Sequence, residues 1–342
     1  MLAIVHVAWI CDDAFISARV VDNFLSGRGL RWNPAERVQA YTHPLWLLCM
    51  IVARCGVQDA YWSLLGLSIV VSGLSVGVIA WTSERPEPFI VAVAGMLALS
   101  KSFVEFSSSG LENPLSHLLI VLLWRETVHK PSPSLLTASV WVGLAALNRM
   151  DLVLLFAPPL FALAKEHTTD RASRSRVLLV LLLPLLAWEC FSLVYYGSLF
   201  PNTALTKLNT GFPRTVLIEH GLSYLRQPVR NDPLSLVLLL VGLPLGLIRG
   251  KGPLRAFCAG AALYLGYVVW IGGDFMAGRF LSAPVLIAVL ALIELLPVPR
   301  PSLQAAVVAA AVALQFVSPT RVWAAPLPLS WASPPAIFAH SC

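Results

Sequence analysis

The sequence has 342 residues, of which 57% are hydrophobic and 12% are charged, and this is too apolar for a soluble globular domain and typical of a membrane protein. The formal net charge of +6 does not come from a basic stripe with interleaved aromatic residues, so nucleic acid is not expected as a partner. The six cysteines form no Cys-x-x-Cys pair and have no histidine cluster near them, which gives a disulfide framework or a zinc site little support.

Apolar blocks of nearly spanning length recur along the chain. A helix needs roughly 20 apolar residues to cross a hydrocarbon layer about 30 Å thick, because every backbone amide must be bonded within the segment. Hydropathy predicts spans at Tyr61–Trp81, Phe89–Val104, Asn113–Trp124, Leu135–Leu147, Leu152–Ala164, Val177–Val194, Leu234–Ile248, Ala256–Ile271, Phe280–Leu296 and Leu303–Val317. The predicted fold is an all-α polytopic bundle of about ten or eleven transmembrane helices, some of them tilted or short.

The two ends of the sequence differ from these blocks. Met1–Cys11 is apolar but too short to cross a bilayer, and it has no basic region or small-x-small site of a signal peptide, so we expect an incomplete first span. The prolines from Pro326 to Pro335 predict an irregular tail over residues 319–342. Residues 1–318 are therefore expected to form one transmembrane domain without internal repeats.

The positions of Lys and Arg predict the topology. Short basic loops stay in the cytoplasm, and eleven Lys or Arg lie in the loops Thr82–Pro88, Arg125–Ser134, Lys165–Arg176, Arg249–Arg255 and Pro297–Ser302. The longer loops 12–43 and 195–233 are then expected outside. All five basic loops share one side only if residues 44–57 do not cross, so we assign this segment as a juxtamembrane helix on the outer surface.

This topology gathers acidic residues at one side of the bilayer. Ionisable groups at such depth are costly, and clusters of them usually mark a functional site. The acids placed near outer helix ends are Asp12, Asp13, Glu105, Glu112, Asp151 and Asp274.

Five motifs occur in an order that resembles the GT-C glycosyltransferases. The first loop carries Asp12-Asp13, Gly27-Arg28-Gly29, Asn33, Glu36-Arg37-Val38 and Tyr41-Thr42-His43-Pro44. It is followed by Ser108–Glu112, Asn148–Asp151, Tyr195–Ala204 with Lys207, and Gly272–Phe275 with Gly278-Arg279. Within the GT-C enzymes, the pattern is most similar to bacterial members that include the mycobacterial terminal arabinofuranosyltransferases.

This resemblance implies a membrane enzyme that takes a sugar from a polyprenyl-phosphate donor. The acceptor would be a glycan or lipid of the cell envelope, reached from the outer face of the inner (plasma) membrane, and arabinofuranose from a decaprenyl donor is the first expectation for the sugar, transferred with inversion. The arabinofuranosyltransferases also carry a large external C-terminal domain with no counterpart after Val317, which leaves acceptor recognition open and keeps an inactive homologue among the alternatives.

The chemistry requires a base for the acceptor hydroxyl, and a carboxylate within hydrogen-bond reach can take its proton. By the resemblance the base is Asp12 or Asp13, and we prefer Asp13. Adjacent residues at a helix start point about 100° apart, so one acid can face the cavity while the other caps the helix. The alternative is that both acids cap a helix starting near Ala14. Glu112 is expected to orient the acceptor or the sugar, unless it is only a first-turn acid favoured by the helix dipole.

The departing phosphate requires fixed cations, and the candidates are Arg149, Lys207 and Arg279. Structural ion pairs of Arg149 with Asp151 and of Arg279 with Asp274 are the alternatives for those residues.

Three further expectations concern the sugar site and a metal. Tyr196, with Tyr195, either lines the sugar site or anchors a helix at the membrane interface. His43 is included among the candidate substrate-binding residues, although its position before Pro44 favours a hydrogen-bonded surface residue. The carboxylates are also compatible with a divalent cation such as Mg²⁺ or Mn²⁺, which the spacing does not require.

Two other functional classes place ionisable groups among membrane helices. One is a transporter or lipid flippase, although the repeated halves common in transporters are not visible here. The other is a non-catalytic subunit that anchors other envelope enzymes.

Overall fold

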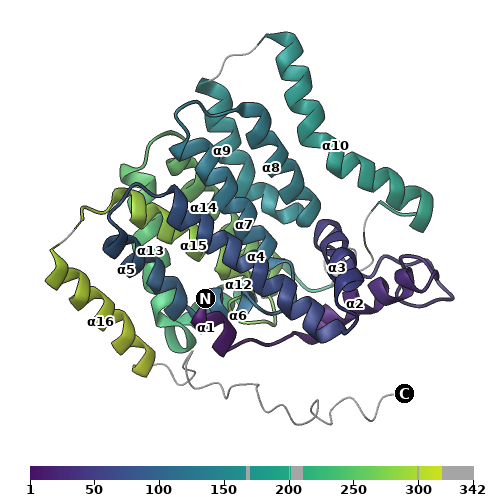
Figure 1. The fold of residues 1–342 in the computed structure, drawn as a ribbon, viewed down its shortest axis with the longest axis horizontal. Coiled ribbons are helices and arrows are strands. Elements are labelled where there is room, and N and C mark those ends of the chain that lie inside the picture. Colours follow the sequence, from purple (N-terminus) through teal and green to yellow (C-terminus); the bar gives the residue numbers. More distant parts are fainter. Residues whose placement is uncertain (167–169, 200, 202–210, 299, 318–342) are drawn as a thin grey trace.

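The computed structural model describes residues 1–166, 170–199, 201, 211–298 and 300–317, and every regular element within these ranges is a helix. The predicted all-helical class is therefore confirmed. The helices pack into one assembly, in which α10 (Arg171–Tyr196) and α16 (Pro301–Val317) lie at opposite edges (Figure 1).

The N-terminal part of the chain forms α1 (Leu2–His6), α2 (Asp12–Leu25), α3 (Pro44–Gly56) and α4 (Ala60–Thr82). Proline suits the first turn of α3, where its missing N–H has no intrahelical partner to lose. Asp59 caps α4 by accepting a hydrogen bond from the Trp62 N–H at 2.9 Å. The short helix predicted at residues 44–57 is therefore present, while its place relative to a membrane stays a prediction.

The predicted span Phe89–Val104 is wrong as a single helix. The chain breaks at Ser100, between α5 (Glu87–Leu99) and α6 (Lys101–Phe106). Ser100 adopts an extended conformation, and its hydroxyl accepts from the Phe103 N–H at 3.2 Å, which caps α6. Hydropathy could not find this break, because a serine within an apolar block changes the average very little.

The central helices follow the predicted blocks closely. They are α7 (Asn113–Trp124), the π-turn η1 (Arg125–His129), α8 (Leu135–Asn148), the 3₁₀ turn η2 (Met150–Leu152) and α9 (Val153–Glu166). Helix α10 starts six residues before its predicted apolar block, where Asp170 caps it by accepting from the Ser173 N–H at 3.3 Å. Apolar run length was therefore a good guide to this part of the fold.

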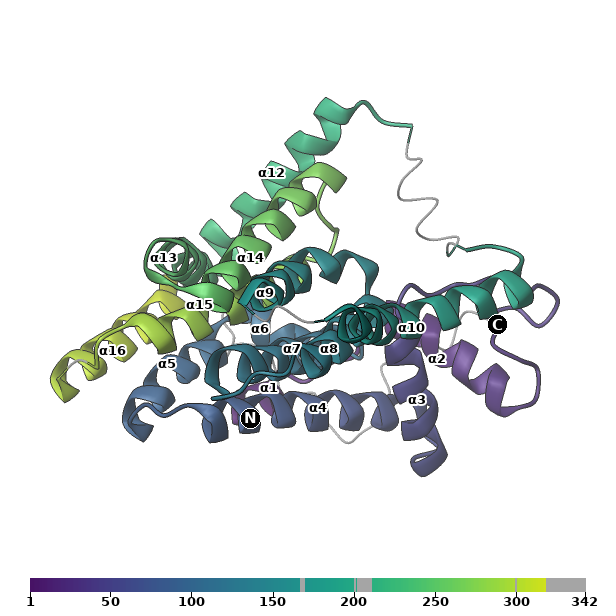
Figure 2. The same cartoon turned by 90° about the horizontal axis from the view of Figure 1, so that it is seen from above.

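The predicted external loop 195–233 is only partly irregular. Residues 214–231 form α12 (Arg214–Asn231), which meets α13 (Pro233–Arg249) at a bend of 114°. Asp232 sits at the bend and caps α13 through the Ser235 N–H at 3.3 Å. The sequence prediction missed α12 because this helix is polar on average, and a search for apolar blocks does not detect a polar helix. Figure 2 shows α12 and α14 (Gly252–Ile271) rising together from the layer that holds α4, α7 and α8.

The core lies around α15 (Ser282–Leu295), which follows the 3₁₀ turn η3 (Arg279–Leu281). Every residue from Ser282 to Ile293 is buried, and α13, α5, α6 and α7 pack against this helix. A helix that is apolar on all sides is expected in such a position.

Three of the described helices, α4, α10 and α14, are long and apolar enough to cross a bilayer alone. The bent pair α12 and α13 counts as a fourth if it forms one span. The other apolar helices are shorter, since 14 residues of α-helix such as α8 extend only about 21 Å. These helices support a membrane protein, whereas the number of crossings predicted above is not established by them.

Several predicted cytoplasmic loops meet at one end of the assembly. The guanidinium of Arg125 lies 4.5 Å from the centre of the Trp81 ring, and His129 Nε2 lies 2.8 Å from a Glu294 carboxylate oxygen. Arg85 donates to the backbone carbonyl of Glu294. The loops that begin at Thr82, at Arg125 and after Leu295 therefore lie together.

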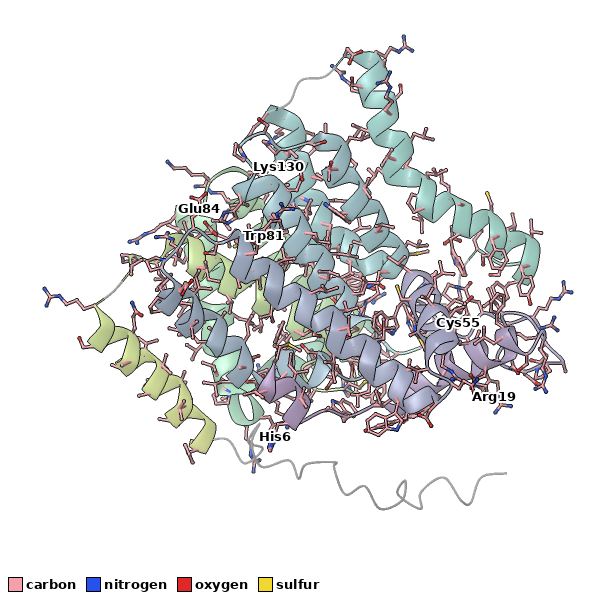
Figure 3. The ribbon with its side chains drawn as sticks, viewed as in Figure 1. His6, Arg19, Cys55, Trp81, Glu84 and Lys130 are labelled. Atoms are coloured by element: carbon pink, nitrogen blue, oxygen red, sulfur yellow. The ribbon has the colours of Figure 1, made fainter. Side chains whose placement is uncertain are left out.

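Figure 3 shows the same arrangement with side chains. Trp81, Glu84 and Lys130 lie near one another in this view, and Arg19 and Cys55 lie on the opposite side of the assembly.

Candidate active site

The site is built on the turn that precedes α7. Gly110 has φ +77°, and a Cβ at this position would lie 2.9 Å from the Cβ of Ala14 on α2, so only glycine fits without displacement. Trp46 of α3 donates its indole N–H to the Gly110 carbonyl at 2.8 Å, and the Cys11 N–H donates to the Ser109 carbonyl at 2.9 Å. The start of α2 and one side of α3 are thereby fixed against the turn that carries Glu112.

Glu112 is the centre of the site and is fully buried. Its Oε1 accepts one hydrogen bond from Arg149 Nη1 and one from Arg279 Nη2, each at 2.9 Å. Burial by itself would raise the pKa of Glu112, but Arg279 and Arg149 hold it well below its usual range. The two guanidiniums, which are also buried, are therefore neutralised in part by one shared ionised carboxylate.

Two more carboxylates extend the cluster. Asp151 accepts from Arg149 Nε at 2.9 Å and also from its Nη2, and Asp274 accepts from Arg279 Nη1 at 3.3 Å. The Tyr264 hydroxyl of α14 lies 3.4 Å from an Asp151 oxygen. The ion pairs considered as alternatives for Arg149 and Arg279 are therefore present, but Glu112 joins them into one network of three carboxylates and two guanidiniums.

Two amides lock the backbone around this network. Asn148 donates to the Glu112 carbonyl at 3.2 Å, and Asn113 donates to the Arg279 carbonyl at 3.1 Å. The connections before α7, after α8 and before α15 are thus held together by hydrogen bonds as well as charge. We refer to Glu112, Arg149, Asp151, Asp274 and Arg279 as the charged cluster.

The interpretation of His43 as a surface residue is wrong. His43 is 7% exposed, its Nε2 lies 2.9 Å from Ser17 Oγ, and its Nδ1 lies 3.5 Å from Glu112 Oε2. Burial and the nearby arginines lower the pKa of His43 to about 4, although Glu112 opposes this shift. His43 directly precedes α3. Because Trp46, on the first turn of α3, is held against Gly110, His43 lies beside Glu112.

The paired acids of the first loop begin α2. Asp12 is exposed, and its Oδ1 accepts from the Asp13 N–H at 2.9 Å and from Cys11 Sγ at 3.1 Å. Asp13 is half-buried and precedes Ser17 by four residues, so the two side chains share one face of the helix. That face leads through Ser17 and His43 to Glu112. The roles predicted for both acids stay predictions.

Tyr196 lies at the first loop. Its hydroxyl is 2.8 Å from that of Tyr41 and donates to the Leu30 carbonyl at 2.5 Å. The Gly-x-Gly motif has a packing reason here, because Gly29 has φ +87° and a Cβ would collide with the Tyr195 hydroxyl. The end of α10 is therefore joined to loop 12–43, and the sugar contact predicted for Tyr196 is not tested by this geometry.

The remaining candidates are placed differently. Lys207 and residues 202–204 lie outside the described residues, as does the tail 319–342. Glu105 forms an i,i+4 salt bridge with Lys101 at 3.0 Å on α6. Among the residues that the structure describes, no three His, Cys, Asp or Glu side chains converge in a way that could hold a metal ion, so we derive no step through a divalent cation.

Sequence reasoning missed two residues that complete this geometry. Ser17 lies within the first loop 12–43, and its i,i+4 spacing from Asp13 was the available signal. Tyr264 lies within an apolar block, where nothing in the local sequence indicates its contact with Asp151.

Comparison with known proteins gave two related sequences. The chain is 31% identical to a terminal beta-(1->2)-arabinofuranosyltransferase of Mycobacterium tuberculosis, over 86% of this chain and 53% of the relative. It is 29% identical to a protein of the same name from Corynebacterium glutamicum, over 85% of this chain and 48% of the relative. The predicted resemblance to terminal arabinofuranosyltransferases is confirmed. The chain spans about half the length of these two relatives.

Two other comparisons gave no match. No family model matches the chain, and no solved structure matches it.

Proposed function

We propose that this chain is a membrane glycosyltransferase that transfers a pentose, arabinofuranose first, from a polyprenyl-phosphate donor to a cell-envelope acceptor outside the cytoplasm. The observation that carries the proposal is the charged cluster, which is assembled from three distant connections beside the paired acids of α2. The similarity to two arabinofuranosyltransferases, over 86% and 85% of this chain, supports it.

In the proposed reaction the acceptor hydroxyl attacks the anomeric carbon while Asp13 takes the hydroxyl proton. A new carbon–oxygen bond forms on the acceptor, and the bond from the anomeric carbon to the phosphate oxygen breaks. That oxygen keeps the electron pair, so the polyprenyl phosphate leaves with one more negative charge. Attack on the side opposite the leaving group inverts the anomeric centre. The reaction therefore needs a base on one side of the sugar and fixed cations on the other.

Arg279 is the better phosphate ligand of the two described arginines. A guanidinium has five N–H groups. Arg149 uses its Nε, Nη1 and Nη2 atoms on Asp151, Glu112 and Tyr264. Arg279 donates to Asp274 and Glu112 through its Nη atoms, and its buried Nε has no hydrogen-bond partner among the described residues. An arginine paired in this way can still donate its remaining N–H groups to phosphate.

The proposed arrangement in the membrane follows from the same site. Residues 1–318 form a GT-C-like bundle of about ten or eleven crossings in the inner membrane, with the charged cluster toward the outer face and the basic loops in the cytoplasm. The meeting of the loops after α4, α7 and α15 at one end of the assembly supports this orientation.

The test uses the purified full chain in lipid nanodiscs with a radiolabelled polyprenyl-phosphate arabinose and an arabinan acceptor. We expect labelled product from the wild-type chain and its loss in Asp13→Asn. An assay with and without a chelator would show whether a divalent cation is required. If the chain instead moves the labelled donor across the membrane of proteoliposomes and forms no product, it is a carrier. If it shows neither transfer nor transport, a non-catalytic subunit is the remaining alternative.

A further inference from the structure

Three buried polar side chains connect the start of α2 to the charged cluster. Ser17 Oγ lies 2.9 Å from His43 Nε2, and His43 Nδ1 lies 3.5 Å from Glu112 Oε2. All three side chains are shielded from solvent. They come from α2, from the residue that caps α3 and from the turn before α7, so no local sequence rule requires them to meet.

The surroundings of His43 determine which ring nitrogen carries the proton. Glu112 is ionised because it binds both guanidiniums through Oε1, and its Oε2 and His43 Nδ1 face each other at 3.5 Å, longer than an ordinary hydrogen bond, with no other partner for either atom among the described residues. An ionised carboxylate only accepts hydrogen bonds, so the nitrogen that faces it, Nδ1, is the one that holds the proton of a neutral ring. Nε2 is then bare and accepts the hydrogen bond that Ser17 donates.

The charges around the ring exclude a role as the main base. Besides Ser17 and Glu112, the groups that act on His43 are Arg149 and Arg279, and with burial they lower its pKa to about 4. A group with this pKa is a poor proton acceptor at neutral pH. A fixed neutral ring between a hydroxyl and a carboxylate is, however, well suited to hold two helices in register.

We propose that His43 is a positioning residue of the transfer reaction: as the Nδ1–H tautomer it ties Ser17 to Glu112, and so fixes the Asp13 face of α2 relative to the arginines. The connection is short, because Asp13 and Ser17 are one helical turn apart. This inference rests on the proposed function, in which Asp13 is the base. In this inference, His43 and Ser17 set the position of Asp13 relative to the arginines that receive the leaving phosphate.

Two substitutions of His43 each remove one of its two contacts and keep the other. His43→Asn keeps an N–H near the position of Nδ1 and can still face Glu112, but it loses the acceptor for Ser17. His43→Gln places its amide oxygen near the position of Nε2 and can still accept from Ser17, but it loses the contact with Glu112. Ser17→Ala removes the hydroxyl that lies against His43 Nε2 and leaves His43 itself unchanged. His129→Asn is the matched control, because His129 pairs with Glu294 at 2.8 Å at the opposite end of the assembly.

The kinetic test measures transfer by these variants in nanodiscs. We expect kcat to fall about tenfold or more in His43→Asn, His43→Gln and Ser17→Ala, with the KM for the donor changed by less than about threefold, because misplacing the base affects the chemical step more than donor binding. His43→Asn and Ser17→Ala combined should cost no more than one of them, because both break the same connection. A kcat within about twofold of wild type in His43→Asn and Ser17→Ala, or additive losses, would overturn the proposal.

Two further readouts do not depend on transfer. Nitrogen-15 spectra of histidine-labelled protein at pH 7 should show a His43 ring protonated at Nδ1 and bare at Nε2, assigned by its absence in His43→Asn. Hydrogen exchange of the amides of residues 12–17 should be faster in His43→Asn and Ser17→Ala and unchanged in His129→Asn. If the wild-type chain transfers no sugar, the proposed function fails, and these two readouts still decide whether the connection exists. A ring protonated at Nε2, or unchanged exchange in both variants, contradicts it.

Discussion

The two ends of the helix assembly both carry ion pairs, but they are built in different ways. At the end formed by the loops after α4, α7 and α15, Lys130 binds Glu126 four residues away and its side chain is 46% exposed. In the charged cluster, Glu112 is fully buried and binds arginines 37 and 167 residues away in the sequence. The Lys130–Glu126 pair needs no tertiary structure and His129–Glu294 joins two segments, whereas the charged cluster exists only after three connections have folded together.

The difference bears on where we propose the chemistry. In the i,i+4 pair the Lys130 side chain reaches solvent, which screens the interaction, although Glu126 is buried and also accepts from the Ser134 N–H. A buried network costs desolvation energy for each charge, and in the charged cluster Arg279 Nε has no hydrogen-bond partner among the described residues. This remaining N–H is the donor that we propose for the leaving phosphate.

The largest effect is expected from Glu112→Gln, which leaves two buried guanidiniums facing a neutral amide. We expect a loss of about 2–3 kcal/mol of stability, together with loss of transfer, because both guanidiniums lose their charge-assisted hydrogen bond to Oε1 and keep only Asp151 and Asp274 as ionised partners. Thermal unfolding in nanodiscs measures the first and the radiolabel assay the second. Lys130→Ala at the other end is the control and should cost less than about 1 kcal/mol. Equal losses in the two variants would remove the distinction between the ends.

Asp13→Asn should separate catalysis from folding. We expect transfer to fall about 10²–10⁴-fold because the acceptor proton has no base to receive it, with the unfolding temperature close to that of wild type. Asp12→Asn is the matched variant and should lose less, because Asp12 is exposed and its Oδ1 binds the backbone of α2. A greater loss in Asp12→Asn would exchange the roles of the two acids.

Arg279→Lys and Arg149→Lys should differ although both keep the positive charge. Arg279→Lys should reduce kcat/KM for the donor about 10- to 100-fold, since the compact ammonium of lysine cannot span Asp274, Glu112 and a phosphate as the planar guanidinium does. Arg149→Lys should act mainly on the unfolding temperature, because the guanidinium contacts of Arg149 are to protein groups. If both variants lose stability alone, neither arginine is a donor ligand.

Gly110→Ala tests the turn that holds Glu112 against α2. We expect a loss of about 2 kcal/mol or more, because the positive φ is strained for alanine and the new Cβ would collide with Ala14. Gly27→Ala is the control, since Gly27 has a similar φ of +76° but open space around it, and it should lose less. Chemical denaturation compares the two, and the close packing of α2 on this turn would be in doubt if they matched.

The smallest expected effect is a difference in pH dependence. The folded-state pKa of His43, about 4, lies below its ordinary value of 6.5, so between these values the unfolded chain binds a proton that the folded chain does not. The stability contributed by neutral His43 is complete above pH 6.5 and is lost as the pH falls toward 4. Between pH 7 and 5 the wild type should therefore lose more stability than His43→Asn, by the order of 1 kcal/mol. Parallel unfolding curves of the two proteins would contradict the shift.

Much of the fold could be predicted from hydropathy, but its breaks could not. The ends of α7 were predicted to the residue, because an apolar run between polar turns defines a helix in lipid. The break at Ser100 and the helix α12 were missed, since the first depends on one capping hydroxyl and the second is a polar helix. The short helix at residues 44–57 was found from its apolar composition, and the positive-inside pattern assigned it to the outer surface, which stays a prediction.

The sequence alone determined the helical class, most helix positions, the residue types of the site and the resemblance to arabinofuranosyltransferases. These follow from composition and motif order, which need no knowledge of contacts. Only the tertiary structure decided that Glu112 joins both arginines and that His43 is buried between Ser17 and Glu112. Charges and hydrogen bonds depend on distance in space, and residues from α2, α3, α7 and η3 come within bonding distance only when the helices pack.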